Sequence, residues 1–287
     1  MAMWKQWRDK LFAVLPAAWQ PWLLNNVVQR IVAGVVLVPL VLWAIWDTSM
    51  VFALMVWGCL ILVVREWQRM VEPDNWHSTV HYLYSSVILL AVVQSLLGAG
   101  AALVALIILP TFLWLVANMA SLRRPLWFAF SILYLSIAPI ALLTLQDGYT
   151  IGPALLTYYF GVVWATDTAA YVIGKRLGGP LLAPDVSPRK TWSGFIGGLV
   201  AGTLVGGTVA AVLGATLHWG MGIALLISAV AQASDLCESG IKRFYSVKDT
   251  GSIIPGHGGV LDRVDSILLS APFFVLLQFI AGRSLPW

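Results

Sequence analysis

Residues 194–217 read GFIGGLVAGTLVGGTVAAVLGATL and contain no charged side chain. A helix of about 20 apolar residues is long enough to cross the hydrocarbon core of a bilayer. We therefore predict that this stretch is a membrane-spanning helix. Its many glycines indicate close packing against other helices, because small residues let helix backbones approach one another in a membrane.

The rest of the chain is nearly as apolar as this stretch. Of its 287 residues, 60% are hydrophobic and 10% are charged, and the mean hydropathy is +0.85. About a quarter of the residues of a soluble domain are charged, so these values exclude a large soluble domain. The net charge of +4 is small, and no basic run indicates a nucleic-acid partner.

Apolar runs separated by polar residues predict an all-α, polytopic integral membrane protein with about nine transmembrane helices. These helices cover roughly residues 31–46, 51–64, 82–97, 101–119, 126–145, 151–173, 194–217, 222–233 and 266–281. We expect an N-terminal interfacial segment at residues 1–29, N-terminal transmembrane helices at residues 30–150, and a C-terminal transmembrane catalytic region at residues 151–287. The first segment mixes aromatic and basic residues, which is typical of a helix lying in the membrane interface.

Basic residues follow a consistent alternation along these predicted helices. All of the 17 Lys and Arg residues except Arg283 lie before the first predicted helix or after the second, fourth, sixth or eighth. With nine helices, these segments share one side of the membrane, and positively charged loops mark the cytoplasmic side. The pattern predicts a cytoplasmic N-terminus and places the polar loops of the C-terminal half on the cytoplasmic face.

Two of these loops hold most of the residues that could carry chemistry. The first starts at the end of the sixth predicted helix and covers residues 164–191, and the second covers residues 234–266. They bracket the hairpin formed by the seventh and eighth predicted helices. We therefore expect the two loops to meet in space.

Acidic residues in the second loop occur as two pairs with helical spacing. Asp235 and Glu238 are three residues apart, as are Asp262 and Asp265, so each pair shares one face of a helix. Acidic groups at membrane depth are costly and usually have a partner or a function. Carboxylates clustered beside Lys and Arg, rather than beside His and Cys, suit Mg²⁺, which prefers oxygen ligands and is often shared with substrate phosphates. The alternative is that these acids only pair with neighbouring Lys and Arg side chains.

Basic residues and glycines in the same loops are suited to binding phosphate. Lys and Arg side chains stabilise the charge that develops during phosphoryl-type transfer. Gly256, Gly258 and Gly259 surround His257, and glycine lets backbone N–H groups approach an anion closely. We expect a phosphate-binding set made of Lys190, Lys242, Arg243, Lys248, Arg263 and His257.

One further pair of charges follows the second predicted helix. Glu66 and Arg69 are three residues apart, which is the spacing of an ion pair within one helix. We interpret them as such a pair rather than as catalytic residues.

A longer pattern fills the second loop. Residues 239–265 read S-x-I-K-R-x₄-K-D-x-G-x₂-I-P-x-H-G-G-V-x-D-R-V-D. This pattern resembles the signature of the phosphatidate cytidylyltransferases, the CDP-diacylglycerol synthases. The blocks WATDT (164–168), SPRKT (187–191) and SDLCES (234–239) also resemble the family, so the likeness covers about residues 160–266. Thr166, Ser193 and Ser234 depart from the residues common in the family, and Ser193 receives no role from it.

The resemblance implies a reaction and a set of site residues. CTP and phosphatidate would give CDP-diacylglycerol and pyrophosphate with Mg²⁺, while the lipid tails stay in the bilayer. The metal would be held by Asp235, Asp262 and Asp265, and more weakly by Glu238 and Asp167. Further substrate contacts would come from Ser187, Thr191, Ser239, Asp249, Gly258 and Gly259. We expect a bacterial inner (plasma) membrane as the location, no nucleic-acid partner, and leave a homodimer open.

Two other hypotheses remain open at this point. A cytidylyltransferase could act on another lipid phosphate, such as a polyprenyl phosphate. An ion-coupled transporter would also contain buried acids, but it would place them near the bilayer midplane and often in repeated halves. Here the acids cluster at one interface and in one half of the chain, which favours an enzyme.

Overall fold

The computed structural model describes the backbone of residues 26–251 and 258–280 and the side chains from Gly34 onward within these ranges. Residues 1–25 of the predicted interfacial segment lie outside the described residues, and residues 26–29 open the first described helix. The predicted boundary near residue 150 falls in the turn between two helices. The division into two regions stays a prediction.

Helices make up most of the described chain, and one short β-hairpin, which the sequence did not predict, interrupts them. The helices are α3 (Asn26–Asp47), α4 (Ser49–Val71), α5 (Trp76–Met119), α6 (Pro125–Gly148), α7 (Gly152–Leu177), α8 (Trp192–Val212), α9 (Leu217–Phe244) and α10 (Leu261–Ile280). Strands β1 (Leu181–Ala183) and β2 (Ser187–Thr191) pair antiparallel between α7 and α8.

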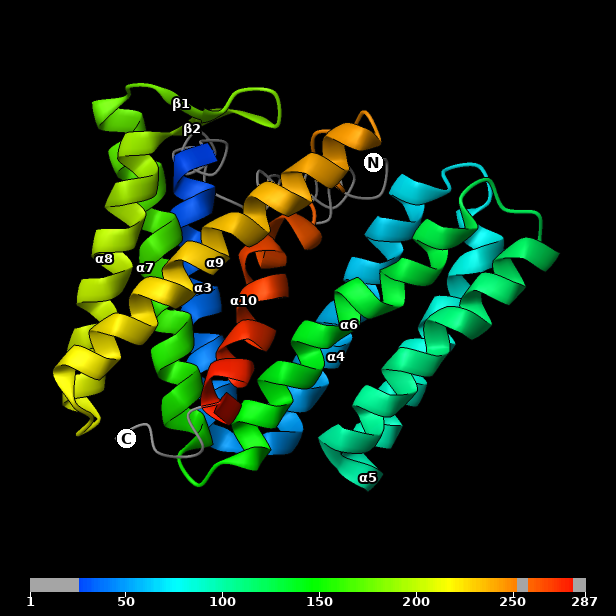
Figure 1. Cartoon of the computed structure of the whole chain (residues 1–287), viewed down its shortest axis with the longest axis horizontal. Coiled ribbons are helices and arrows are strands. Elements are labelled where there is room, and N and C mark those ends of the chain that lie inside the picture. The colour runs from blue at the N-terminus through cyan, green and yellow to red at the C-terminus, as the bar shows by residue number, and fades with distance from the viewer. Residues whose placement is uncertain (1–25, 252–257, 281–287) are drawn as a thin grey trace, which may run out of the picture.

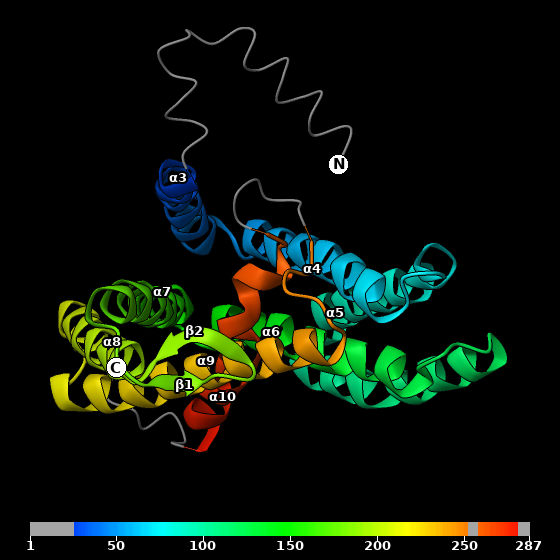
Figure 2. The ribbon, with the colours of Figure 1, turned by 90° about the horizontal axis from the view of Figure 1, so that it is seen from above.

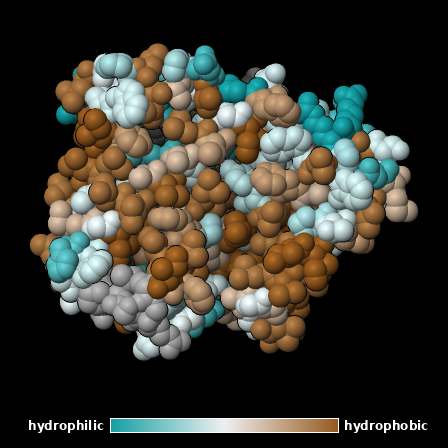
Figure 3. Space-filling model, in the orientation of Figure 1, coloured by the Kyte–Doolittle hydropathy of each residue, from teal (hydrophilic) through white to brown (hydrophobic). Residues whose placement is uncertain are grey.

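Six of the described helices are long and apolar enough to cross a membrane, namely α4, α5, α6, α8, α9 and α10. The prediction of a polytopic helical membrane protein is confirmed in this coarser form, and the count of nine helices stays a prediction. The face of the molecule seen in Figure 3 is accordingly mostly hydrophobic.

Helix α5 covers two of the predicted membrane-spanning segments. Gly98 lies between them with φ 82° and ψ 176°, outside the helical region of backbone conformation. A positive φ costs glycine little because it has no Cβ. The chain therefore turns at this residue, and Figure 1 shows α5 as two arms that meet at the lower end of the view.

Helix α10 lies in the middle of the helical assembly. It packs against α9, α6, α4 and α7, and Figures 1 and 2 show it between α7 and α8 on one side and α4 and α5 on the other. The β-hairpin, the end of α9 and the start of α10 lie at the same end of the bundle, which is the upper end in Figure 1. This arrangement brings the two polar loops to one place.

Glycines of α8 provide the close helix packing that the sequence predicted. A Cβ added to Gly202 would lie 2.1 Å from Ser228 Oγ and 2.3 Å from Thr166 Oγ1, and one added to Gly206 would lie 2.3 Å from Ala224 Cβ. Because Thr166 belongs to α7 and Ser228 and Ala224 belong to α9, α8 can approach both helices only with glycine at these positions.

Replacing Gly206 with Ala should therefore destabilise the contact of α8 with α9. Overpacking a close contact typically costs about 1–3 kcal/mol, so we expect the Gly206→Ala protein in detergent to unfold several degrees below the wild type. Gly222→Ala is the matched control, since no atom lies within 4 Å of a Cβ at that position of α9. Equal unfolding temperatures for the two variants would contradict the packing argument.

Candidate active site

A cavity of about 570 Å³ lies where α7, the β-hairpin, α8, α9 and α10 converge. Both polar loops contribute to its walls, as their positions around the hairpin of α8 and α9 led us to expect. The site residues predicted from the sequence that line it are Asp167, Lys190, Thr191, Asp235, Asp262, Arg263 and Asp265. Acidic and basic side chains from four separate segments thus face one space.

An ion pair joins the two loops across this cavity. The Nζ atom of Lys190 on β2 lies 2.7 Å from a carboxylate oxygen of Asp235 on α9, and both side chains are partly exposed. The hairpin that carries Lys190 begins after Gly178 and Gly179, whose φ values are 61° and 102°. Glycine readily adopts these backbone conformations, so the chain can reverse here and bring Lys190 toward α9.

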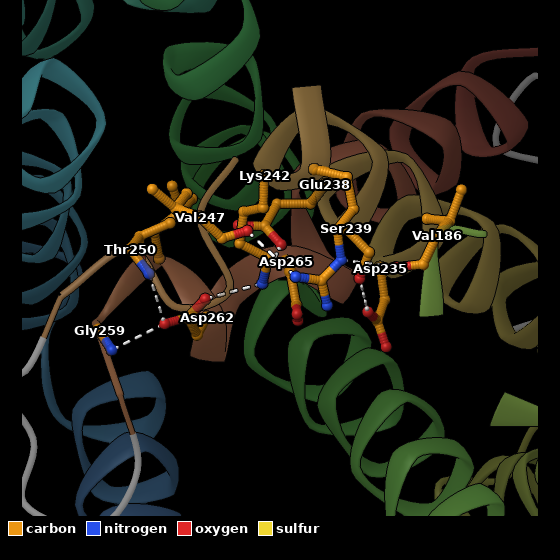
Figure 4. Close-up of polar contacts among 12 residues, drawn as sticks. Val186, Asp235, Glu238, Ser239, Lys242, Val247, Thr250, Gly259, Asp262 and Asp265 are labelled. Carbon is orange, nitrogen blue, oxygen red and sulfur yellow. Dashed lines mark hydrogen bonds and ion pairs between the residues drawn. The ribbon is translucent and has the colours of Figure 1, made fainter. Parts of the chain in front are cut away.

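A second ion cluster lies deeper, between α9 and α10 (Figure 4). The Nζ atom of Lys242 lies 2.6 Å from Glu238 Oε2 and 2.8 Å from Asp262 Oδ1, and all three side chains are at most 10% exposed. Asp262 Oδ2 also accepts hydrogen bonds from the backbone N–H groups of Thr250, at 3.1 Å, and Gly259, at 2.8 Å. The cluster therefore ties α9, α10 and the segment between them together.

Two serine residues form hydrogen bonds with Asp167 and Asp265. Ser266 Oγ donates a hydrogen bond to Asp167 Oδ2 at 3.0 Å, which links α10 to α7. The backbone N–H of Ser266 donates to Asp265 Oδ1 at 2.8 Å. Ser234 Oγ on α9 donates to the backbone carbonyl of Asp265 and accepts from the N–H of Leu269. Ser234, one of the positions that depart from the family, thus joins α9 to α10.

The four acids with helical spacing separate into two roles. Asp235 and Asp265 line the cavity, whereas Glu238 lies against Lys242. Asp262 does both, since it lines the cavity and pairs with Lys242. The alternative interpretation of the sequence, in which the acids pair with nearby bases, therefore describes Glu238 and part of the surroundings of Asp235 and Asp262.

The carboxylates that face the cavity fit a magnesium ion that is shared with a substrate. Within the described residues, no group of three or more His, Cys, Asp or Glu side chains is arranged to hold a metal ion. Mg²⁺ is, however, usually held by one or two carboxylates together with substrate phosphates and water. Asp167, Asp235 and Asp265 offer such carboxylates on the wall of a cavity that also contains Lys190 and Arg263.

Two of the predicted phosphate or substrate ligands, Thr191 and Arg243, make structural contacts. Thr191 Oγ1 accepts the N–H of Gly194 at 3.2 Å and so caps the start of α8. Arg243 donates to the backbone carbonyls of Val186, at 3.1 Å, and Val247, at 3.2 Å. Arg243 therefore braces the β-hairpin against the end of α9.

The other predicted ligands within the described residues do not line the cavity. Ser239 Oγ donates to Asp235 Oδ1 at 3.4 Å, and Ser187 opens strand β2. Lys248 and Asp249 are exposed, and Gly258 has a φ of 82°. His257 lies outside the described residues.

Glu66 was interpreted wrongly from the sequence. Its side chain is only 1% exposed, and its Oε2 atom accepts hydrogen bonds from the N–H of Leu261 at 2.9 Å and from Thr250 Oγ1 at 3.3 Å. Arg69 instead stacks on the ring of Trp76, with its guanidinium carbon 5.0 Å from the ring centroid. No local pattern could have found this contact, because its partners lie 184 and 195 positions further along the chain.

Comparison with known proteins adds to this geometry. The family model described as "Cytidylyltransferase family" matches residues 28–281. The phosphatidate cytidylyltransferase of Brucella suis biovar 1 is 35% identical over 255 residues, which cover 88% of this chain and 93% of that protein. The enzyme of the same name from Rickettsia bellii is 34% identical over 267 residues, which cover 90% of this chain and 92% of that protein. The phosphatidate cytidylyltransferase of Bacillus subtilis is 37% identical over 179 residues, which cover 61% of this chain and 66% of that protein.

The buried cluster predicts a large effect of removing its single positive charge. Lys242→Met leaves the carboxylates of Glu238 and Asp262 buried without their counter-charge, and breaking a buried ion pair costs about 3–5 kcal/mol. We expect a marked fall in the unfolding temperature in detergent. Lys248→Met, at an exposed lysine of the same segment, should unfold at nearly the wild-type temperature. If the two variants unfolded alike, Lys242 would not hold α9 to α10.

Proposed function

The chain belongs to the cytidylyltransferase family, and on this premise we propose that its cavity is the site at which CTP and a membrane lipid react. The activity is that of a phosphatidate cytidylyltransferase, in which CTP and phosphatidate give CDP-diacylglycerol and pyrophosphate. The observation that carries this assignment is the agreement of the family match over residues 28–281 with relatives of that name across most of the chain. The two rival hypotheses, another lipid acceptor or a transporter, are not favoured.

The reaction needs positioning and charge neutralisation more than proton transfer. A phosphate oxygen of phosphatidate attacks the α-phosphorus of CTP and forms a new P–O bond. The bond from the α-phosphorus to the oxygen bridging to the β-phosphorus breaks, and pyrophosphate leaves with that electron pair. The nucleophile is already anionic, so a strong general base is not required. Holding both reactants in line and stabilising the charge can supply most of the rate acceleration.

Among the basic residues that line the cavity, we assign phosphate binding to Lys190 and Arg263. Both residues line the space in which the triphosphate would lie, and cationic side chains stabilise the charge on phosphoryl oxygens. Lys242 does not line the cavity but forms an ion pair with Asp262, which does, and so helps to hold Asp262 in place. The roles predicted for Arg243, Lys248 and His257 in binding phosphate stay predictions.

We further propose that Asp167, Asp235 and Asp265 hold Mg²⁺ together with the phosphates of CTP. The ion would neutralise phosphate charge and act as a Lewis acid on the phosphoryl oxygens. Asp235 contacts Lys190, so these two side chains would share the binding of metal and phosphate. Ser266, which donates to Asp167 and whose N–H donates to Asp265, would keep both carboxylates aimed at the cavity.

The placement of the chain in the membrane is part of the proposal. The break at Gly98 supports nine membrane crossings, because it separates two predicted helices that α5 joins. In Figure 1 the end of α7, the end of α9 and the start of α10 lie toward the same, upper end of the view, and their loops carry the basic residues that favour the cytoplasmic side. We propose a cytoplasmic N-terminus and cytoplasmic active site in a bacterial inner membrane. The homodimer stays a prediction.

The most direct test supplies CTP labelled in its cytosine ring to membranes that contain the protein. With phosphatidate and Mg²⁺ we expect a labelled CDP-lipid, and we expect none after chelation of divalent cations. A polyprenyl phosphate should be a poor acceptor. Failure to form a CDP-lipid from phosphatidate would contradict the activity, and equal turnover after chelation would contradict the metal.

Asp265→Asn tests the proposed metal site. Removing a carboxylate charge from the ion should abolish turnover, while the amount of protein inserted in the membrane stays normal. Asp185→Asn is a suitable control, because Asp185 lies exposed in the turn of the β-hairpin and should leave turnover unchanged. Near-normal activity of the Asp265→Asn protein would remove Asp265 from the metal site.

A further inference from the structure

A buried carboxylate from the N-terminal half of the chain reaches the loop beside the active site. Glu66 lies near the end of α4, and its side chain is 1% exposed. Its Oε2 atom accepts hydrogen bonds from outside α4, namely from the N–H of Leu261 and the hydroxyl of Thr250. The residues of α4 do not line the cavity, so Glu66 cannot act on the substrates from the wall of that space.

The segment between α9 and α10 is closely fitted to this carboxylate. A Cβ added to Gly251 would lie 2.4 Å from Glu66 Oε1, and a Cβ added to Gly259 would lie 2.4 Å from Glu66 Oε2. Real Cβ atoms essentially never come so close to another heavy atom. The close approach of Glu66 therefore gives a structural reason for glycine at these two positions of the 239–265 pattern.

The contact also provides a hydrogen-bond acceptor for the first N–H group of α10. The first N–H groups of a helix have no partner within the helix, and a negative charge there is favourable because of the helix dipole. Leu261 is the first residue of α10, and its N–H donates to Glu66 at 2.9 Å. Glu66 is thus a cap supplied to α10 by another helix.

A second carboxylate also holds this segment. Asp262, in the first turn of α10, accepts the N–H groups of Thr250 and Gly259, as Figure 4 shows. The backbone of Thr250 is therefore bound by Asp262 while its hydroxyl is bound by Glu66. Together the two acids fix both the segment and the first turn of the helix, from which Asp262, Arg263 and Asp265 reach the cavity.

We propose that Glu66 is a positioning residue for the transfer site: it fixes the start of α10 from α4 and thereby aims Asp262, Arg263 and Asp265 into the cavity. The expected effect of Glu66 on turnover rests on the proposed function, whereas its effect on the start of α10 does not. It gives the N-terminal half of the chain a part in the reaction.

The test compares Glu66→Gln and Glu66→Ala with the wild type in detergent. Gln keeps an acceptor oxygen without the charge, whereas Ala removes the acceptor, so the effects should be graded. Backbone amide hydrogen exchange of a peptide covering residues 258–265 should accelerate about tenfold or more in Glu66→Ala, the factor expected from losing a hydrogen bond to a charged group. The kcat for CDP-lipid formation should fall by at least about the same factor, with a smaller change in KM for CTP, because Lys190 is not displaced.

Glu72→Gln and Glu72→Ala are matched controls. Glu72 is the C-cap residue of the same helix, is also 1% exposed, and accepts a hydrogen bond from the backbone N–H of Arg124 at 3.0 Å. Loss of this hydrogen bond should lower the unfolding temperature. It should leave kcat per folded molecule and amide hydrogen exchange in residues 258–265 near the wild-type values.

Three results would count against the proposal or separate it from the proposed function. A Glu66→Ala protein with faster exchange but wild-type kcat would overturn the positioning role. A fall in kcat that merely follows the unfolding temperature, equally for Glu66 and Glu72 variants, would also overturn it. If the wild type made no CDP-lipid, the proposed reaction would fail, whereas the exchange measurement would still decide whether Glu66 fixes the start of α10.

Discussion

The buried ammonium group of Lys242, held between Glu238 and Asp262, is the interaction on which the arrangement of the active site depends. Charges buried among membrane helices are tolerated only when they are paired, because desolvation of each ion is costly. Here the pairing joins α9 to α10, and Asp262 extends it to the backbone of Thr250 and Gly259. The buried cluster thus determines where the first turn of α10 lies.

This arrangement divides a dense set of charges into a support and a reactive surface. Glu238 and Lys242 form the support, and Glu66 adds to it from α4. The cavity, where the charges of a nucleoside triphosphate and a metal ion would be neutralised, is faced by Asp167, Asp235, Asp265, Lys190 and Arg263. A cavity at one end of a bundle of apolar helices lets a soluble nucleotide meet a lipid whose tails remain in the bilayer. The same physical requirement, that buried charge be compensated, governs both groups.

The sequence predicted the parts of this picture that depend on local patterns. Apolar runs located the helices, the glycines of α8 indicated its close packing, and the two polar loops around α8 and α9 do meet. The break in α5 was also anticipated as a gap between two predicted helices near Gly98.

Features that depend on long-range contacts could not be predicted in this way. Helical spacing grouped Asp235 with Glu238, but one carboxylate contacts Lys190 and the other contacts Lys242. The hairpin of β1 and β2 is too short for a clear pattern of alternation. Glu66 resembled half of an ordinary helical ion pair, because nothing near it in the sequence indicates a partner 195 positions away.

The central claim, that this cavity transfers the cytidylyl group and not another part of the nucleotide, is tested most directly by the fate of each phosphorus. CTP labelled at the α-phosphorus and CTP labelled at the γ-phosphorus would be supplied separately to the purified protein with phosphatidate and Mg²⁺. We predict that all lipid-bound label comes from the α-phosphorus and that the γ-label is released as pyrophosphate in equal amount. Label from the γ-phosphorus in the lipid, or release of pyrophosphate without labelled lipid, would contradict the account.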